Sequence, residues 1–188
     1  MKTITTPFSD IYDVFLAGIT DDMYMELTEL ETYKLLESLL LDAIVWFEFP
    51  RVQLLDNYET QEMVRIEEYE GVESDDFPVT IYIWNEGKFN VALSSEEINI
   101  LATYMKVEWL GQQLASIDNV RQIYSGDDFK FTSQANHISK LTALKEKYEK
   151  EGFHKQRLYK RRKVDENGIM KSTLGEIMES SVRGDGFI

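Results

Sequence analysis

Apolar residues recur at helical spacing near the amino terminus, first over residues 8–17 and again over residues 29–47. Pro7 suits the first position of the shorter helix, because its missing N–H would have no intrahelical partner there in any case. Thr28 and Glu31 form a capping-box pattern at the start of the longer helix. Apolar residues cover most of the circumference of this longer helix, so we predict that it lies at the centre of the core.

Two further helices are predicted in the second half of the chain. Ser94 and Glu97 repeat the capping-box pattern at the start of residues 95–115, where apolar residues recur at intervals of three and four. The fourth helix, over about residues 133–151, has a narrow apolar stripe and many lysines, which predicts a helix packed on the surface. Its expected caps are Thr132 or Ser133 at the start and Gly152 with Phe153 at the end.

The segment between the second and third helices is predicted to be rich in strands. Residues 79–84 are mostly β-branched or aromatic, residues 85–87 are a turn signal, and residues 88–93 complete a hairpin. A partner strand for this hairpin is suggested over residues 63–69, and the acidic residues 70–76 are expected to form an exposed loop. The aromatic side chains of the hairpin are expected to cover the long core helix.

Together these elements predict a mainly α protein with an inserted β-hairpin or small antiparallel sheet, in which a helical bundle is followed by an extended carboxy-terminal tail. We divide the chain into a helical domain over residues 1–152, with its β-rich insertion at about residues 51–93, and a segment over residues 153–188. An Asn-Gly turn within residues 164–169 is expected to close a small hairpin. The apolar residues after it are too dispersed for a core, so the tail either frays or folds against a partner.

The composition excludes several classes of protein. The chain has 188 residues, 43% of them hydrophobic, and no cysteine, which excludes disulfides, thiol nucleophiles and cysteine-ligated metals. No apolar run approaches the roughly 18 residues that a membrane span needs. No secretory leader is recognisable after Met1 either, so we expect a soluble intracellular protein that does not bind a membrane.

Sequence motifs for catalysis are absent as well. The chain has no phosphate-binding glycine loop, dinucleotide fingerprint, nucleophile elbow or HExxH motif, and its two histidines are too few for a histidine-rich metal site. Acidic pairs at residues 21–22, 75–76 and 127–128 offer oxygens to a divalent cation, but loop solvation and helix capping explain them better. We therefore predict a protein that is not an enzyme and has neither a cofactor nor a metal site.

Charge is distributed unevenly along the chain, whose net charge is −14. Residues 1–128 contain 7 basic and 26 acidic side chains, residues 129–163 contain 11 and 3, and residues 164–188 contain 2 and 5. An acidic body with one basic segment is typical of chains that meet their neighbours through faces of opposite sign. The alternative is that the basic segment is a solvated helix face near its own acidic body.

The carboxy-terminal segment is where we expect a partner to bind. Its cations can contact an acidic surface, and its dispersed apolar residues gain burial only when the tail becomes ordered against another protein. The candidate partner-binding residues are Lys155, Arg157, Lys160, Arg161, Arg162, Lys163, Leu174, Ile177, Met178, Phe187 and Ile188.

The stretch from Leu93 to Glu151 carries a resemblance to a known family. Its two distinctive features are a helix of the form EEI.ILA..M...WL at Glu96–Leu110 and a segment of the form DFK..SQANH...L at Asp128–Leu141. This stretch, about a third of the chain, resembles the head–tail connector proteins of tailed bacteriophages, also called neck or adaptor proteins.

This resemblance implies a structural virion protein in the neck, assembled in the host cytoplasm. Such proteins form rings, commonly dodecameric, between the capsid portal and the stopper or tail proteins, and an extended carboxy-terminal segment docks into the portal protein. Neighbouring copies of the chain would then meet through unlike faces. An acidic lumen would let genomic DNA pass, since favourable phosphate contacts would resist its movement.

Two other functions remain open from the residues alone. An acidic regulatory module or DNA mimic would present its carboxylates to a basic partner. A DNA-associated accessory protein would place the cations between Lys155 and Lys163 on phosphates, and its binding would fall steeply with salt. The strongly acidic residues 1–128 argue against the second of these functions.

Overall fold

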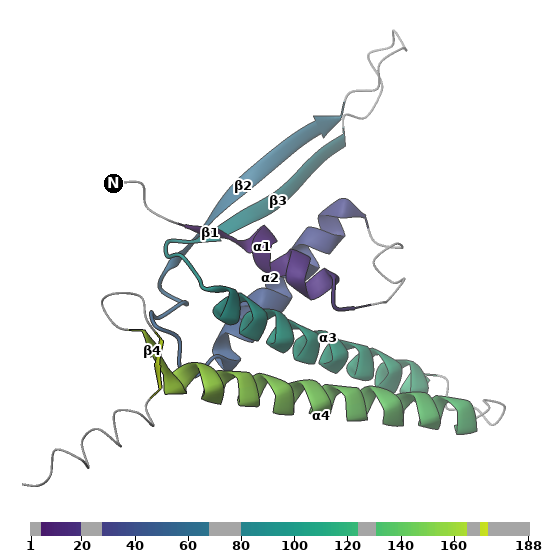
Figure 1. Cartoon of the computed structure of the whole chain (residues 1–188). Coiled ribbons are helices and arrows are strands. Elements are labelled where there is room, and N and C mark those ends of the chain that lie inside the picture. Colours follow the sequence, from purple (N-terminus) through teal and green to yellow (C-terminus); the bar gives the residue numbers. More distant parts are fainter. Residues whose placement is uncertain (1–4, 20–27, 68–79, 124–130, 165–169, 173–188) are drawn as a thin grey trace, which may run out of the picture.

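The structure is a computed structural model that describes residues 5–19, 28–67, 80–123, 131–164 and 170–172 (Figure 1). Its helices are α1 (Phe8–Leu16), α2 (Glu29–Trp46), α3 (Ser95–Ile123) and α4 (Phe131–Arg161). Its strands are β1 (Thr6–Pro7), β2 (Tyr58–Glu67), β3 (Thr80–Phe89), β4 (Arg162–Val164) and β5 (Met170–Ser172). The prediction of a mainly α protein with a small antiparallel sheet is confirmed.

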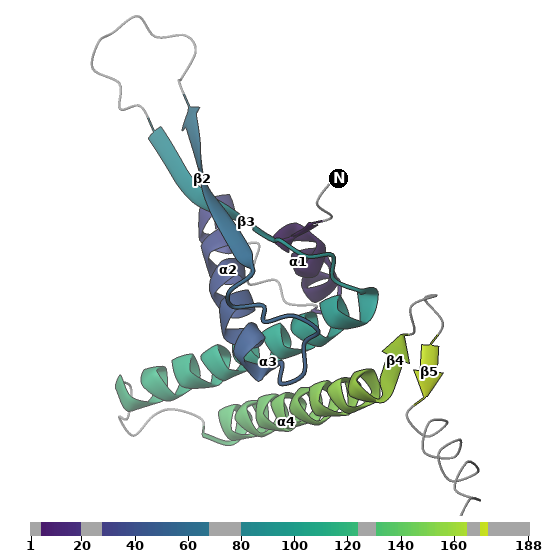
Figure 2. The ribbon, with the colours of Figure 1, turned by 90° about the vertical axis from the view of Figure 1, so that its left-hand side faces the viewer.

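The hydrophobic core is built around α3, which lies between α4 on one side and α1 and α2 on the other (Figures 1 and 2). Between Ile100 and Leu110 every residue except Lys106 and Glu108 is buried. The helix predicted to be central, α2, instead forms one wall of the core, and its Val45 is 71% exposed. The central role of α3 was missed because polar side chains interrupt its apolar arc.

Both predicted capping boxes are present. The Thr28 hydroxyl accepts from the Glu31 N–H at 3.3 Å, and the Glu31 carboxylate accepts from the Thr28 N–H at 2.9 Å. Ser94 and Glu97 make the same two bonds at 3.3 and 2.7 Å before α3. Pro7, expected inside the first helix, is instead its N-cap, because its extended conformation lets it pair with β3.

The sheet has the strand order β1-β3-β2 and is antiparallel throughout. The predicted turn at residues 85–87 is wrong, because β3 continues through it as one strand. The suggested partner strand over residues 63–69 overlaps the true one, β2, which pairs with β3 from Tyr58 opposite Phe89 to Glu67 opposite Thr80. Gly87 allows a close approach, since a Cβ there would lie 2.2 Å from the Phe8 ring.

Strands β2 and β3 form a long ribbon that lies against α2 and projects beyond the helices (Figure 2). Trp84 stacks on Tyr33 of α2 with ring centroids 6.2 Å apart, which confirms that an aromatic side chain of this region covers the long helix. Phe89 instead packs on Phe8 of α1 at 4.9 Å. The ribbon is therefore fixed to both amino-terminal helices.

Helix α4 does not end at Gly152 as predicted but continues to Arg161. It also begins at Phe131, so Thr132 and Ser133 lie in its first turn rather than at its cap. A Cβ on Gly152 would lie 2.7 Å from Cζ of Tyr104, so this glycine allows close packing on α3 and does not cap a helix. In the same way α3 exceeds its predicted length and reaches Ile123.

After α4 the chain forms a small antiparallel hairpin, since β4 pairs with β5 from Arg162 opposite Ser172 to Val164 opposite Met170. The two strands of the predicted hairpin are thus confirmed. The division of the chain at residue 152 stays a prediction, although α4 runs across it. Outside the described residues lie the predicted loops at 70–76 and 125–128, the acidic pairs at 21–22, 75–76 and 127–128, the turn within 164–169, and the tail after residue 172.

Candidate protein-binding surface

The last turns of α4 are fixed to the end of α2 by Gln156, which is buried. Its amide nitrogen donates to the Trp46 carbonyl at 2.8 Å and lies 2.5 Å from the Tyr104 hydroxyl. Its amide oxygen accepts from the Glu48 N–H at 2.8 Å. The carbonyls at a helix end have no intrahelical partner, so one buried side chain from α4 completes the carboxy-terminal end of α2.

A second network joins the start of α3 to the same end of α4. The Glu97 carboxylate is buried and accepts from the Arg51 guanidinium at 2.9 and 2.5 Å, from the Tyr159 hydroxyl at 2.6 Å and from the Ser94 N–H at 2.7 Å. Arg51 also donates to the Ala92 carbonyl at 2.9 Å. Charge-assisted bonds of this kind are stronger than neutral ones, so the network holds three segments in one arrangement.

The protonation of this network is settled at neutral pH. Burial alone would raise the pKa of Glu97, but the hydrogen bonds from Arg51, Ser94 and Tyr159 outweigh burial and lower that pKa below its usual 4.5. The bond to Glu97 raises the pKa of Arg51, and burial beside the same carboxylate raises the pKa of Tyr159. A charged carboxylate, a charged guanidinium and a neutral phenol therefore meet at the base of α4.

Beyond these anchors the end of α4 presents cations beside aromatic rings. The Lys160 ammonium lies 3.9 Å from the centre of the Phe49 ring, and the Arg157 guanidinium lies 5.7 Å from that of Phe153. These distances are typical of cation–π contacts. Phe153 is 49% exposed, and neither Arg157 nor Lys160 forms an ion pair among the described residues.

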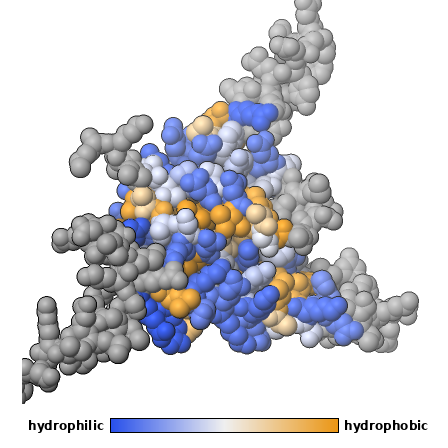
Figure 3. Space-filling model, in the orientation of Figure 1, coloured by the Kyte–Doolittle hydropathy of each residue, from blue (hydrophilic) through white to orange (hydrophobic). Residues whose placement is uncertain are grey.

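We call this area the cation–aromatic surface and define it by Phe49, Phe153, Arg157, Lys160 and Arg161, which line a hollow of about 410 Å³ together with Glu48. The face of the molecule in Figure 3 is mostly hydrophilic, with separate apolar areas, one of them over the region where α4 ends. The surface is suited to an acidic protein segment that also carries apolar side chains, because it offers positive charge and ring faces together.

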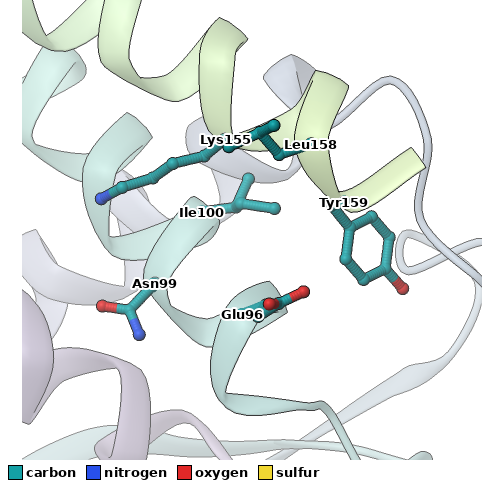
Figure 4. Close-up of a pocket in the computed structure, with 6 residues that line it drawn as sticks. All are labelled: Glu96, Asn99, Ile100, Lys155, Leu158 and Tyr159. Atoms are coloured by element: carbon teal, nitrogen blue, oxygen red, sulfur yellow. The ribbon is translucent and has the colours of Figure 1, made fainter. Parts of the chain in front are cut away.

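Lys155 does not belong to the cation–aromatic surface. Its ammonium donates to the Thr103 hydroxyl of α3 at 2.9 Å and forms an ion pair with Glu151 at 2.7 Å. It lines a different hollow, of about 260 Å³, between the start of α3 and the end of α4 (Figure 4). In this view Lys155 extends along α3 above Asn99 and Ile100, so its main role is to join the two helices.

Of the predicted partner-binding residues, the structure brings Arg157, Lys160 and Arg161 together. Arg162 and Lys163 follow in β4, paired with β5. The apolar candidates Leu174, Ile177, Met178, Phe187 and Ile188 lie outside the described residues and stay predictions.

Sequence reasoning missed the two aromatic members of the surface. Phe153 was assigned to a helix end, and Phe49 was passed over beside Pro50, a residue that is typical of helix termini. A helical wheel drawn through residue 152 would have placed Phe153 next to Arg157, because residues four apart are neighbours on a helix. No sequence signal connects Phe49 with Lys160, which lies 111 positions later.

In the part of the chain that the structure describes, no three side chains of histidine, cysteine, aspartate or glutamate are grouped as metal ligands would be. Nor does any helix in that part have the length and apolar character needed to cross a bilayer. His137 is exposed on α4.

Comparison of the chain with known protein families, with curated proteins and with solved structures finds no match.

Proposed function

We propose that this chain is a structural subunit of a head–tail connector, which forms a ring between the capsid portal and the tail of a bacteriophage. The observation that carries the proposal is the cation–aromatic surface, held at a rigid helix end on a chain whose net charge is −14. The resemblance of residues 93–151 to connector proteins supports the same assignment.

The rigidity of the cation–aromatic surface supports a role in assembly. Gln156 and Tyr159 fix the turn of α4 that carries Arg157 and Lys160, so these cations are held in place before any partner binds. Preorganised groups lose less entropy on binding than flexible ones do. A ring subunit needs such fixed contacts, since the angle between neighbours determines whether the ring closes.

The acidic residues 1–128 also have a function in this proposal, which is to let DNA pass through the ring. Residues 1–128 contain 26 acidic and 7 basic side chains, so most of the chain repels phosphate. A ring with this composition presents few cations to DNA that passes through it. Because each phosphate contact adds to affinity, a lumen with few cations offers little resistance to movement.

The experiment is co-sedimentation of the purified chain with portal rings from a panel of tailed bacteriophages, followed by electron microscopy of the complex. We expect binding that the pair Arg157→Glu and Lys160→Glu abolishes. The matched control is Lys140→Glu with Lys150→Glu, which makes the same charge change at exposed positions elsewhere on α4. The control should bind as the unchanged chain does.

Two results would contradict the connector proposal. A chain that binds none of the portal rings is not a connector subunit, whether or not it forms rings itself. A chain that instead binds duplex DNA through Arg157 and Lys160, with an affinity that falls steeply as salt rises, is a DNA-associated accessory protein.

A further inference from the structure

The ribbon of β2 and β3 presents a second exposed surface, besides the cation–aromatic surface. Its strands pair over ten residues each, while β1 borders β3 only at Lys88 and Phe89. Among the described residues, no strand lies beside the outer edge of β2. A two-stranded ribbon is marginally stable by itself in water, so a long one gains from packing against something else.

One face of the ribbon is apolar and exposed. The register places Val64 opposite Ile83, and Ile81 follows on the same face two residues away. These three side chains are 55%, 45% and 56% exposed. Glu62 precedes Val64 on this face by the same alternation. We call Glu62, Val64, Ile81 and Ile83 the outer ribbon face.

The opposite face of the ribbon is already in use. Trp84 stacks on Tyr33 of α2, and Arg65 forms an ion pair with Glu29 at 3.2 Å. On the outer side Asn85, which lies opposite Glu62, donates to Glu37 of α2 at 3.4 Å. Val64, Ile81 and Ile83 lie farther along the ribbon, and a cover for them would come from outside the described part of the chain.

The charges identify what fits this face. Strands β2 and β3 contain four acidic and two basic side chains, and Glu62 is the charged one on the outer ribbon face. Residues 153–163, which include most of the cation–aromatic surface, contain six basic side chains and no acidic one. One surface is acidic and aliphatic and the other is cationic and aromatic, so they are complementary in both charge and apolar character.

These two surfaces cannot meet within one copy. The outer part of the ribbon lies at the start of α2, as the ion pair between Arg65 and Glu29 shows, whereas Phe49 follows the end of α2. The 18 residues of α2 span about 27 Å. Figures 1 and 2 both place the projecting ribbon and the end of α4 at opposite ends of the molecule.

We propose that the outer ribbon face of one copy packs against the cation–aromatic surface of the next copy. Glu62 then faces Arg157 or Lys160, and the aliphatic side chains cover Phe153. This inference rests on the proposed function and names the neighbouring subunit as the partner of that surface, so the pair Arg157→Glu and Lys160→Glu abolishes portal binding by preventing the subunits from forming a ring. Because the two faces differ, the contact is head-to-tail, and it produces a ring when the rotation between neighbouring copies closes.

The test uses two variants that each remove one side of the contact. The ribbon variant carries Glu62→Lys and Ile83→Lys, and the end variant carries Arg157→Ala and Lys160→Ala, so that the two altered faces do not have opposite charges. All four positions are at the surface, and circular dichroism checks that each variant folds. Sedimentation velocity then measures self-association up to about 1 mM, where even millimolar affinities are populated.

We expect each variant alone to associate at least tenfold more weakly than the unchanged chain. An equal mixture of the two should form a heterodimer and nothing larger, since one intact junction remains and neither free end can extend. Its mass should be twice the 22.0 kDa of one chain, about 44 kDa. Asp42→Lys and the pair Lys140→Glu with Lys150→Glu are the controls and should associate normally.

The outcomes separate this inference from the connector proposal. A chain that binds portal rings but never self-associates, or whose ribbon variant assembles normally, overturns the inference and leaves the connector proposal intact. A mixture that fails to restore the heterodimer also overturns the inference. Self-association through the two surfaces without any portal binding supports the inference and removes the connector proposal.

Discussion

Two glycines on facing helices offer a matched test of how closely α4 packs on α3. Gly152 lies within α4 and Gly111 within α3, and each is replaced by alanine. In a helix, alanine is favoured over glycine by about 0.8–1 kcal/mol. Both substitutions therefore gain the same amount from the backbone, and any difference between them reports on packing.

The packing differs strongly between the two positions. A Cβ at Gly111 meets only Cε of the flexible Lys145, at 3.5 Å, which is an ordinary contact. A Cβ at Gly152 would lie 2.7 Å from Cζ of Tyr104. That ring cannot move aside, because it stacks on Trp46 at 5.8 Å and its hydroxyl is bonded to Gln156. Overpacking of this kind costs about 1–3 kcal/mol.

We therefore expect the two substitutions to change the free energy of unfolding in opposite directions. Gly111→Ala should stabilise the protein by roughly 0.5–1 kcal/mol, and Gly152→Ala should destabilise it by roughly 1 kcal/mol after its backbone gain is included. For a chain of this size these changes correspond to about 2–4 °C in Tm for each kcal/mol. Thermal and urea unfolding, followed by circular dichroism, measure the stability of both variants. Equal stabilisation by the two substitutions would refute the close approach of α4 to α3.

Three further predictions concern the contacts that hold the candidate surface. Glu97→Gln should lower the free energy of unfolding by about 2–3 kcal/mol at pH 7. The exposed control Asp42→Asn should lower it by less than about 0.5 kcal/mol. Because the folded state lowers the pKa of Glu97, the carboxylate stabilises the protein above its usual pKa of 4.5, and urea titrations should show the difference from Gln shrinking as pH falls below that value. Gln156→Ala should lower the free energy of unfolding by about 1–3 kcal/mol in urea, since it leaves the partly buried Trp46 carbonyl and Glu48 N–H without this partner; a loss under about 0.5 kcal/mol would contradict the network. Gly87→Ala should lower Tm in thermal unfolding through its clash with Phe8, and an unchanged Tm would contradict this close approach.

Local signals in the sequence predicted local structure well. The capping boxes at Thr28 and Ser94 were found because both partners lie three residues apart, so tertiary context is not needed to recognise them. The partner strand suggested over residues 63–69 overlaps the second half of β2. By contrast, the pairing of Arg51 with Glu97 joins residues 46 positions apart, and nothing in the sequence specifies that distance in space.

Both glycine errors have one physical cause. Gly87 and Gly152 were interpreted as the end of a strand and the end of a helix, because glycine is common at turns and caps. In the structure each one makes room for an aromatic ring, Phe8 or Tyr104, that comes from elsewhere in the chain. A sequence shows the missing side chain but not the ring that requires it, so such glycines cannot be separated from turns by pattern alone.

The error at Gly152 also determined which residues were grouped as the candidate site. With the helix ended at residue 152, the cations that follow formed one continuous basic segment, and Lys155 was grouped with Arg157 and Lys160. Once the helix continues, its period of 3.6 residues places Gln156 and Tyr159 with Gly152 on the side that faces α3. The same period places Arg157 and Lys160 with Phe153 on the other side, while Lys155 reaches Thr103 of α3. Composition alone thus located the positive charge, but the length of α4 decides which cations a partner can contact.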